Sequence, residues 1–356
     1  MTQHHLRLEA FVKLGAFFNS FCEFMDSSVV SKNSSDTWLN AFKNEVEMAR
    51  HHNGWFTVAQ CIHAFGEWGT LLTEKNLRQW MGAYDFKNGE QKTIALIMAG
   101  NIPLVGFHDL LSVLITGNKA LVKLSSNDQK LIPLIFDYLK HIEPHFKDSA
   151  IFTNDKLGAY DAVIATGSNN TARYFEYYFG KKPNIIRKNR NSVAVLTGQE
   201  SSADLTALGE DVFRYFGLGC RSVSKLFVPS GYNFDAFYTA IYGFKDIVNH
   251  HKYANNYDYN KAVYLMSEFK ILDNGFLVLK EDKSYASPIA SVFFEYYDDP
   301  SELKSRLTSE TDKIQCIVSK GFLEHEIAFG ETQKPSLHDY ADGVDTVQFL
   351  LKTSGN

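Results

Sequence analysis

The second quarter of the chain alternates between short apolar runs and helical segments, and this alternation limits the fold more than any other feature. Residues 93–98 and 120–124 have the composition of strands, and an apolar helical segment, 105–115, lies between them. Residues 161–165 repeat the strand pattern and precede a helix rich in Tyr and Phe. Repeated strand-helix units predict neighbouring parallel strands. We therefore expect an α/β fold with a doubly wound parallel sheet.

A second α/β pattern follows from about residue 201. A helical segment at 203–216 precedes a strand at 226–228, and Asp273-Asn274-Gly275 between two apolar runs is typical of a hairpin. Residues 1 to about 90 have helical spacing throughout, and the apolar run 347–351 is expected to return to the first domain. The predicted domains are 1–197, completed by 328–356, and 198–327.

Bulk properties exclude several classes of protein. The 356 residues carry a formal net charge of −5, which argues against a dedicated nucleic-acid surface. The four cysteines are scattered without a Cys-x-x-Cys spacing, as in a reducing compartment. We find neither a secretory signal nor an apolar run long enough to span a bilayer, so we expect a cytoplasmic protein.

One cysteine lies in an unusual setting. Cys220 stands between Gly217-Leu218-Gly219 and Arg221, just after a helical segment and just before a strand. The glycines allow a sharp turn that leaves the sulfur uncovered, and a neighbouring cation favours the nucleophilic thiolate. The alternative is a buried cysteine at a helix-to-strand turn, because an unreacted Cys behaves as a small apolar residue. The local sequence leaves both interpretations open.

Three loops of the first domain follow predicted strands, where open parallel sheets bind ligands. Asn101 follows the first strand, and its amide is suited to an oxyanion or to capping a helix. Gly167-Ser168 opens a helix, which suits either a phosphate or a plain capped turn. Lys123 ends a strand, where it could bind a ligand; the alternative is a solvated lysine without a role in binding.

Other common site motifs are missing from the sequence. There is no Gly-x-Gly-x-x-Gly after a strand and no Gly-x-Ser-x-Gly. The histidine pairs do not occur in His-Glu-x-x-His or beside cysteines, so we expect no metal site.

Four motifs, taken in order, resemble the aldehyde dehydrogenase superfamily. They are Ile97-Met98-Ala99-Gly100-Asn101-Ile102-Pro103-Leu104, the stretch from Thr116-Gly117-Asn118 to Val122-Lys123-Leu124-Ser125, Ala165-Thr166-Gly167-Ser168 and the Cys220 stretch. The similarity is greater to the acyl-CoA reductase branch, typified by the reductase subunit of the bacterial bioluminescence fatty acid reductase. Residues 252–258 and 329–343 also look like that branch. The resemblance covers roughly residue 90 to the end.

The resemblance implies an aldehyde-dehydrogenase-like fold, with 1–197 as the nucleotide-binding domain and 198–327 as the catalytic domain. Cys220 would be the nucleophile and Asn101 the oxyanion-hole amide. Gly167 and Ser168 would lie near the cofactor pyrophosphate.

The same resemblance bears on the cofactor. Lys123 would approach the adenosine ribose, and the position three residues later commonly holds an acidic residue in the superfamily. Here it is Ser126, which leaves room for a 2′-phosphate beside Lys123. We therefore expect NADPH rather than NADH, with NADH left open.

Departures from the superfamily pattern indicate the direction of the reaction. Hydrolytic members carry a glutamate that activates water, but the comparable stretch 186–192 contains no carboxylate, and a second glutamate is missing near Tyr285. The resemblance, together with these departures, implies reduction of an acyl thioester, such as a fatty acyl-CoA, to an aldehyde through an S-acyl-cysteine. Aldehyde oxidation, a non-reducing thiol acyltransferase and a non-catalytic scaffold remain alternatives, and homo-oligomerisation is left open.

Overall fold

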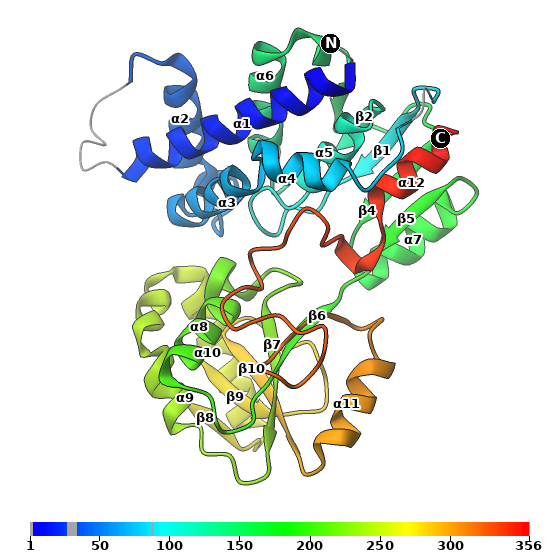
Figure 1. The fold of residues 1–356 in the computed structure, drawn as a ribbon. Coiled ribbons are helices and arrows are strands. Elements are labelled where there is room, and N and C mark those ends of the chain that lie inside the picture. Colours follow the sequence, from blue (N-terminus) through cyan, green and yellow to red (C-terminus); the bar gives the residue numbers. More distant parts are fainter. Residues whose placement is uncertain (1–2, 27–33, 87–88, 356) are drawn as a thin grey trace. The chain divides into compact units, whose positions relative to one another are not determined.

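The computed structural model describes residues 3–26, 34–86 and 89–355, and the chain forms two compact units (Figure 1). The first unit comprises residues 1–188 and 336–356, and the second comprises 189–335. These limits differ from the expected 197/198 and 327/328. Strand β6 (Asn191–Val195) accounts for part of the difference, because it pairs with strands of the second unit. The assignment of the two units to cofactor and catalysis stays a prediction.

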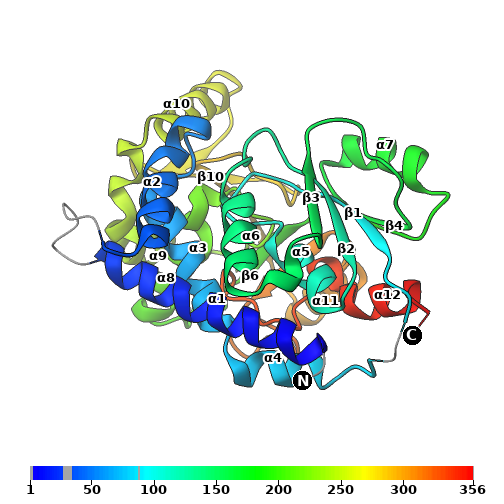
Figure 2. The same cartoon turned by 90° about the horizontal axis from the view of Figure 1, so that it is seen from above.

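The first unit opens with the predicted helical region. Its helices are α1 (Gln3–Asp26), α2 (Thr37–His52), α3 (Val58–Leu71) and α4 (Glu74–Met81). Figure 2 shows α1 running beside α3 and α6 (Leu131–Ile142), both of which it contacts. The buried rings of Phe18, Phe42 and Phe65 pack together between these helices. This core supports the sheet of the first unit and carries no chemical motif.

The sheet of the first unit, sheet A, has five parallel strands in the order β3-β2-β1-β4-β5. The strands are β1 (Thr93–Ile97), β2 (Lys119–Lys123), β3 (Ala150–Thr153), β4 (Ala162–Thr166) and β5 (Asn184–Arg187). Leu96 on the central strand pairs with Val122 on one side and Ile164 on the other. The strand order reverses direction between β1 and β4, as in doubly wound dinucleotide-binding sheets. The predicted parallel sheet is confirmed.

Helices α5 (Phe107–Ile115), α7 (Asn169–Phe179) and α12 (Thr346–Thr353) complete the first unit, with short turns η1 (Pro144–Phe146) and η4 (Ala341–Gly343). Helix α12 contacts α5, so the apolar tail returns to the first unit as predicted. The helical segment expected at 105–115 starts two residues later than predicted. Leu104 is left-handed (φ 59°), so the helix begins only at Phe107, after Gly106.

A buried ion pair fixes α5 to the end of β5. Both oxygens of the Asp109 carboxylate accept hydrogen bonds from Arg187, at 2.6 and 2.8 Å, and Arg187 also donates to Thr346 on α12. Both charged side chains are less than a tenth exposed. Pairing and hydrogen bonding offset the cost of removing these charges from water. The pair therefore joins three segments of the first unit.

The second unit is built on the six-stranded sheet B, ordered β11-β6-β7-β10-β9-β8. Its further strands are β7 (Val223–Pro229), β8 (Ile271–Asp273), β9 (Val278–Glu281), β10 (Ser291–Tyr297) and β11 (Ile314–Val318). Only β8 runs antiparallel to its neighbour, and the β8–β9 hairpin confirms the turn predicted at Asn274-Gly275. The helical elements are α8 (Ser202–Phe213), η2 (Arg214–Gly217), α9 (Asp235–Ala240), η3 (Ile241–Asn249), α10 (His251–Met266) and α11 (Pro300–Ser309).

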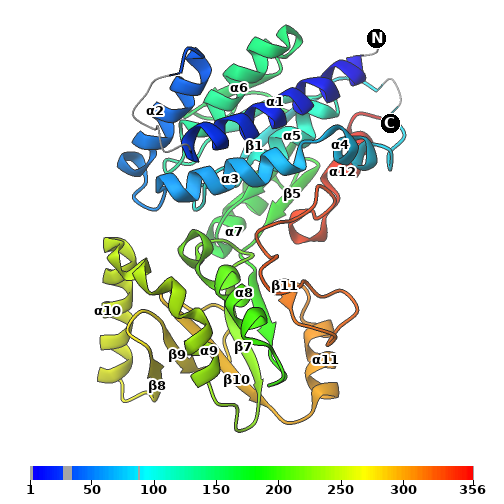
Figure 3. The same cartoon turned by 60° about the vertical axis from the view of Figure 1, so that its left-hand side comes forward.

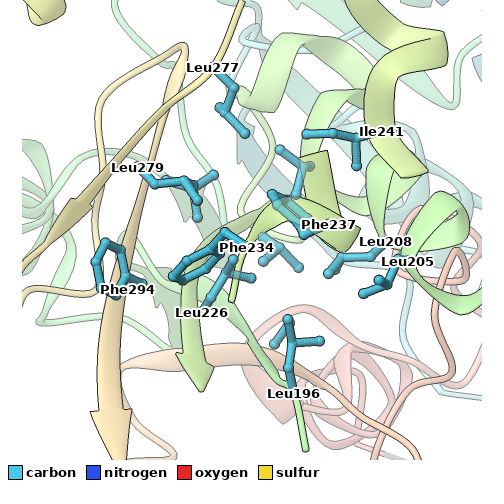
Figure 4. Packing of buried hydrophobic residues seen from close by; sticks show 14 of the residues in the cluster. Leu196, Leu205, Leu208, Leu226, Phe234, Phe237, Ile241, Leu277, Leu279 and Phe294 are labelled. Carbon is cyan, nitrogen blue, oxygen red and sulfur yellow. The ribbon is translucent and has the colours of Figure 1, made fainter. Parts of the chain in front are cut away.

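Sheet B is covered on both faces, as Figure 3 shows for α9 and α10 on one side and α11 on the other. On the first side, Leu205 and Leu208 of α8 and Phe237 of α9 pack against the strands (Figure 4). On the second side, Leu303 and Leu307 of α11 pack against residues of β6, β7 and β11. Two covered faces explain why most residues of β6, β7 and β10 are buried. Among the described residues, no helix is long and apolar enough to cross a membrane.

Candidate active-site residues

The chain approaches Cys220 through an unusual backbone turn. After α8 it passes through three left-handed residues, Tyr215 (φ 53°), Phe216 (φ 58°) and Gly217 (φ 75°). A left-handed conformation is unfavourable for a bulky residue, by roughly 1–2 kcal/mol each. Burial offsets this cost, since the Phe216 ring lies 4.3 Å from that of His250. Backbone strain of this kind concentrates at functional sites.

Hydrogen bonds then hold the turn on both sides of the cysteine. Ser192 Oγ on β6 donates to the Cys220 carbonyl oxygen at 2.9 Å. The Ser222 N–H donates to the Gly219 carbonyl at 3.0 Å, which closes a tight turn around Cys220. Arg221 Nε donates to the carbonyl of Thr332. The cysteine is therefore fixed in position by its own backbone and by its neighbours.

The thiol of Cys220 is exposed, which contradicts the interpretation of a buried structural cysteine. Cys61 and Cys316 are buried, and Cys22 is partly buried. Burial raises the pKa of Cys22 to about 11 and that of Cys61 to about 12, with smaller contributions from Glu23 and Asp128 respectively. Such thiols are poor nucleophiles at neutral pH, because only the thiolate reacts. Among the four cysteines, access favours Cys220 as the reactive one.

Cys220 lies at the amino edge of sheet B. It directly precedes β7, and its partner Ser192 stands in the first part of β6. Ligands usually bind at the carboxyl ends of parallel strands, so this rule does not predict the position of Cys220. That rule does describe the other candidates, which follow β1, β2 and β4 of sheet A.

Asn101 lies in the turn that follows β1, and this turn packs tightly. A Cβ atom added to Gly100 would lie 2.7 Å from the Ser125 Cβ, so only glycine allows the β1 loop to approach the β2 loop this closely. Asn53 Nδ2 donates to the Gly100 carbonyl at 3.2 Å. The N-cap of α5 is Gly106, so Asn101 does not serve as the N-cap of this helix. Asn101 thus lies on a fixed loop, where its side-chain amide could donate a hydrogen bond to a ligand.

Gly167 and Ser168 connect β4 to α7. Ser168 is the N-cap of α7, and its Oγ accepts a hydrogen bond from the Thr171 N–H at 3.2 Å. A Cβ at Gly167 would meet Phe175 at 2.9 Å and Thr171 at 3.0 Å. The capped-turn alternative is therefore correct for Ser168. It leaves the predicted pyrophosphate role open, because the other N–H groups at a helix start still favour an anion.

Lys123 and Ser126 lie at the carboxyl end of β2. Lys123 Nζ donates to the Asp155 carbonyl at 3.3 Å, and Ser126 is exposed. The nearest acidic residue along the chain, Asp128, is buried and accepts a hydrogen bond from the Leu131 N–H at 3.4 Å. Burial raises the pKa of Asp128 to about 6. Asp128 is thus turned toward the start of α6, and the loop surface at Ser126 is uncharged.

The candidates divide between the two units. Asn101, Lys123, Ser126, Gly167 and Ser168 belong to the first unit, where sheet A brings their three loops to one edge. Cys220 belongs to the second unit. A common oxyanion hole formed by Asn101 and the Cys220 backbone stays a prediction.

Comparison with known proteins finds a family model that matches part of the chain. Residues 74–237 match the family model described as acyl-CoA reductase (LuxC), and this segment includes every candidate site residue. The chain is similar to acyl-CoA reductases of the aldehyde dehydrogenase superfamily. No curated protein matches the sequence.

Solved structures show the same fold at low sequence identity. Aldehyde dehydrogenase 21 from Physcomitrella patens, solved with the reaction product succinate, is 12% identical with a TM-score of 0.69, over 99% of this chain and 85% of that one. The NAD-dependent aldehyde dehydrogenase from Sinorhizobium meliloti is 12% identical with a TM-score of 0.62, over 89% and 70% of the two chains. An NADP-dependent enzyme from E. coli is 12% identical with a TM-score of 0.60, over 88% and 73%. The predicted aldehyde-dehydrogenase-like fold is confirmed.

The residues that hold the Cys220 turn in place could not be found from the sequence. Ser192, which donates to the Cys220 carbonyl, lies within the stretch 186–192. The only feature of this stretch visible in the sequence is its lack of a carboxylate. Thr332 lies in the polar tail, more than a hundred residues from Arg221. Neither serine nor threonine has a local pattern that indicates such a contact.

The exposure of Cys220 and the raised pKa values of Cys22 and Cys61 together predict selective labelling of Cys220. With native protein at pH 8, we expect iodoacetamide to alkylate Cys220 first, because about one in a thousand Cys22 thiols is ionised at a pKa of about 11. Peptide mass spectrometry identifies the modified residue, and Cys220→Ser is the control. Equally fast labelling of Cys22 or Cys61 would contradict the assignment.

Proposed function

We propose that this protein reduces an acyl thioester, such as a fatty acyl-CoA, to an aldehyde with NADPH, through a covalent S-acyl intermediate on Cys220. The observation that carries the proposal is the exposed Cys220 thiol on a strained, hydrogen-bonded turn. The family match over 74–237 supports an oxidoreductase that acts on acyl or aldehyde groups. The physiological setting that we expect is the cytoplasm.

In the first step, the Cys220 thiolate attacks the thioester carbonyl. A new carbon–sulfur bond forms to Cys220, the bond to the donor's sulfur breaks, and the donor leaves as a thiol once it takes up a proton. The Asn101 amide and the Cys220 N–H are the groups that the family resemblance assigns to the developing oxyanion. Donors placed at the site of developing charge are among the largest contributors to catalysis. Covalent catalysis also divides one difficult reaction into two easier ones.

In the second step, the acyl group on Cys220 is reduced. The acyl carbon would receive a hydride, which is the chemistry that a nicotinamide cofactor would supply when bound. The resulting thiohemiacetal on Cys220 then collapses, which releases the aldehyde and regenerates the thiol. Cys220 holds the acyl group in place throughout and serves as the leaving group at the end.

The residues at the edge of sheet A fit a dinucleotide. The loops after β1 and β4 flank the point where the strand order reverses, and α7 begins directly after Gly167-Ser168. The N–H groups at a helix start favour a pyrophosphate. Ser126 is exposed and uncharged, and Lys123 is the cation nearest along this loop, which favours a 2′-phosphate.

The missing glutamates favour reduction over hydrolysis. The stretch 186–192, where hydrolytic relatives carry the water-activating glutamate, instead supplies Arg187 to a buried ion pair and Ser192 to the Cys220 carbonyl. A positioned general base contributes roughly 10²–10⁴-fold to such a step. Without it, the acyl-enzyme has time to be reduced before water attacks.

Loss of the thiol is expected to abolish the reaction. Cys220→Ala should reduce acyl-CoA-dependent NADPH oxidation, followed at 340 nm, by at least about 10³-fold, because it removes the nucleophile itself. Cys22→Ala is the matched control and should retain wild-type activity, because that thiol is partly buried with a high pKa. Persistent aldehyde production by Cys220→Ala rules out the mechanism. Acid formation from aldehyde without CoA would favour the oxidative alternative.

The cofactor assignment is tested at Ser126. We expect Ser126→Asp to lower the preference for NADPH over NADH by about 10-fold or more, because a carboxylate repels a 2′-phosphate and accepts a bond from a 2′-hydroxyl. Asn127→Asp places the same charge on the next exposed residue and serves as the control. The measurement is the ratio of kcat/KM with the two cofactors. An unchanged ratio in Ser126→Asp contradicts the assignment.

A further inference from the structure

A segment near the end of the second unit lies on helix α8, and we call residues 329–333 the strap. Asp211 of α8 accepts three hydrogen bonds from it. The Gly330 N–H donates to Oδ2 at 2.7 Å, while the Thr332 N–H and Oγ1 donate to Oδ1 at 3.0 and 2.8 Å. Asp211 and Thr332 are both fully buried. One carboxylate thus holds two residues of the strap.

The chemistry of this contact requires a carboxylate. Burial raises the pKa of the Asp211 carboxyl, and the hydrogen bonds from Gly330 and Thr332 oppose the shift. Both oxygens accept, and all three donors are neutral N–H or O–H groups. An amide in this place would turn an NH₂ group toward one of these donors, because it has only one acceptor oxygen. A buried donor would then lose its partner.

Backbone geometry brings the strap and the helix into close contact. Gly330 is left-handed (φ 83°), and a Cβ atom there would lie 3.1 Å from the Ala207 Cβ. Ala207 and Asp211 are four residues apart, so both face the strap from one side of α8. The strap therefore cannot move without breaking contacts along a full turn of the helix.

The other side of the strap reaches the residues that follow the reactive cysteine. The Thr332 carbonyl accepts from Arg221 Nε, and Gln333 Nε2 donates to Ser222 Oγ at 3.3 Å. Arg221 and Ser222 directly follow Cys220. The strap thus lies between a buried carboxylate on one side and the Cys220 turn on the other.

We propose that Asp211 is a positioning residue for Cys220, acting through Thr332 of the strap and Arg221. This inference rests on the proposed role of Cys220 as the nucleophile. Asp211 and Ser192 then hold the turn from two sides, the first through the strap and the second by its bond to the Cys220 carbonyl. A fixed turn keeps the sulfur and its own N–H aligned with the substrate carbonyl, and a misplacement of about 1 Å costs roughly 10²-fold in rate.

The central variant is Asp211→Asn. We expect kcat for acyl-CoA-dependent NADPH oxidation to fall by roughly 10- to 100-fold, with KM changed little. Amide hydrogen exchange should become about 10-fold faster in peptides from the strap and also in peptides covering 214–224, since one lost hydrogen bond corresponds to about that factor. If Asp211 only held the strap, exchange in Asp211→Asn would be faster in the strap alone.

Asp204→Asn is the matched control on the same helix. Asp204 forms the capping box with Ser201 and an ion pair with Lys320, and no contact of it with the strap is present. We expect faster exchange only at the start of α8, with kcat unchanged. Thr332→Ser keeps every bond to Asp211 and should match the wild type, while Thr332→Val loses the Oγ1 bond and should lie between the wild type and Asp211→Asn. The Thr332 pair also tests the proposal if Asp211→Asn fails to fold.

The result that overturns the proposal is an Asp211→Asn protein with faster exchange in the strap but wild-type kcat and wild-type exchange at 214–224. Wild-type protein without any reductase activity would instead contradict the proposed function. The exchange measurement needs neither acyl donor nor cofactor, so it decides the positioning role in either case.

Discussion

Three consecutive left-handed residues, Tyr215, Phe216 and Gly217, follow helix α8 and lead the chain to the exposed Cys220. Two of them are bulky and buried, so packing must compensate for an unfavourable backbone. Ser192 then holds the cysteine from the sheet side, and the strap holds the residues that follow it. The exposure of this thiol, and with it the proposed chemistry, depends on this turn.

The two units contribute differently to the proposed reaction. Sheet A provides a carboxyl edge whose loops are fixed by close packing, as at Gly100, and by a capped helix at Ser168. Sheet B provides the thiol from its amino edge, where the turn enters β7. The stretch 186–192, where the resemblance to hydrolytic aldehyde dehydrogenases would place a water-activating glutamate, here supplies Arg187 to a buried ion pair and Ser192 to the Cys220 carbonyl. In the proposed reaction, this absence of a water-activating base favours hydride transfer to the acyl carbon over attack by water.

The sequence predicted those parts of the structure that depend on local patterns. Strands β1, β2 and β4 of sheet A, and the β8–β9 hairpin, follow from apolar runs and turn residues. Helix α10 was missed because apolar and polar residues do not separate along it: its buried face includes Asn260, while Leu265 and Met266 are exposed. The contact of Asp211 with Thr332 spans more than a hundred residues, so no local pattern indicates it. The order of the strands likewise depends on tertiary packing.

The central claim is that an acyl group is transferred to Cys220, and the acyl-enzyme itself tests it most directly. The protein is incubated with a long-chain acyl-CoA in the absence of nicotinamide and analysed by intact and peptide mass spectrometry. The account predicts one added acyl mass, located on the peptide that contains Cys220 and lost when NADPH is added. Aldehyde production without any acyl adduct on Cys220, or an adduct on another cysteine instead, would contradict it.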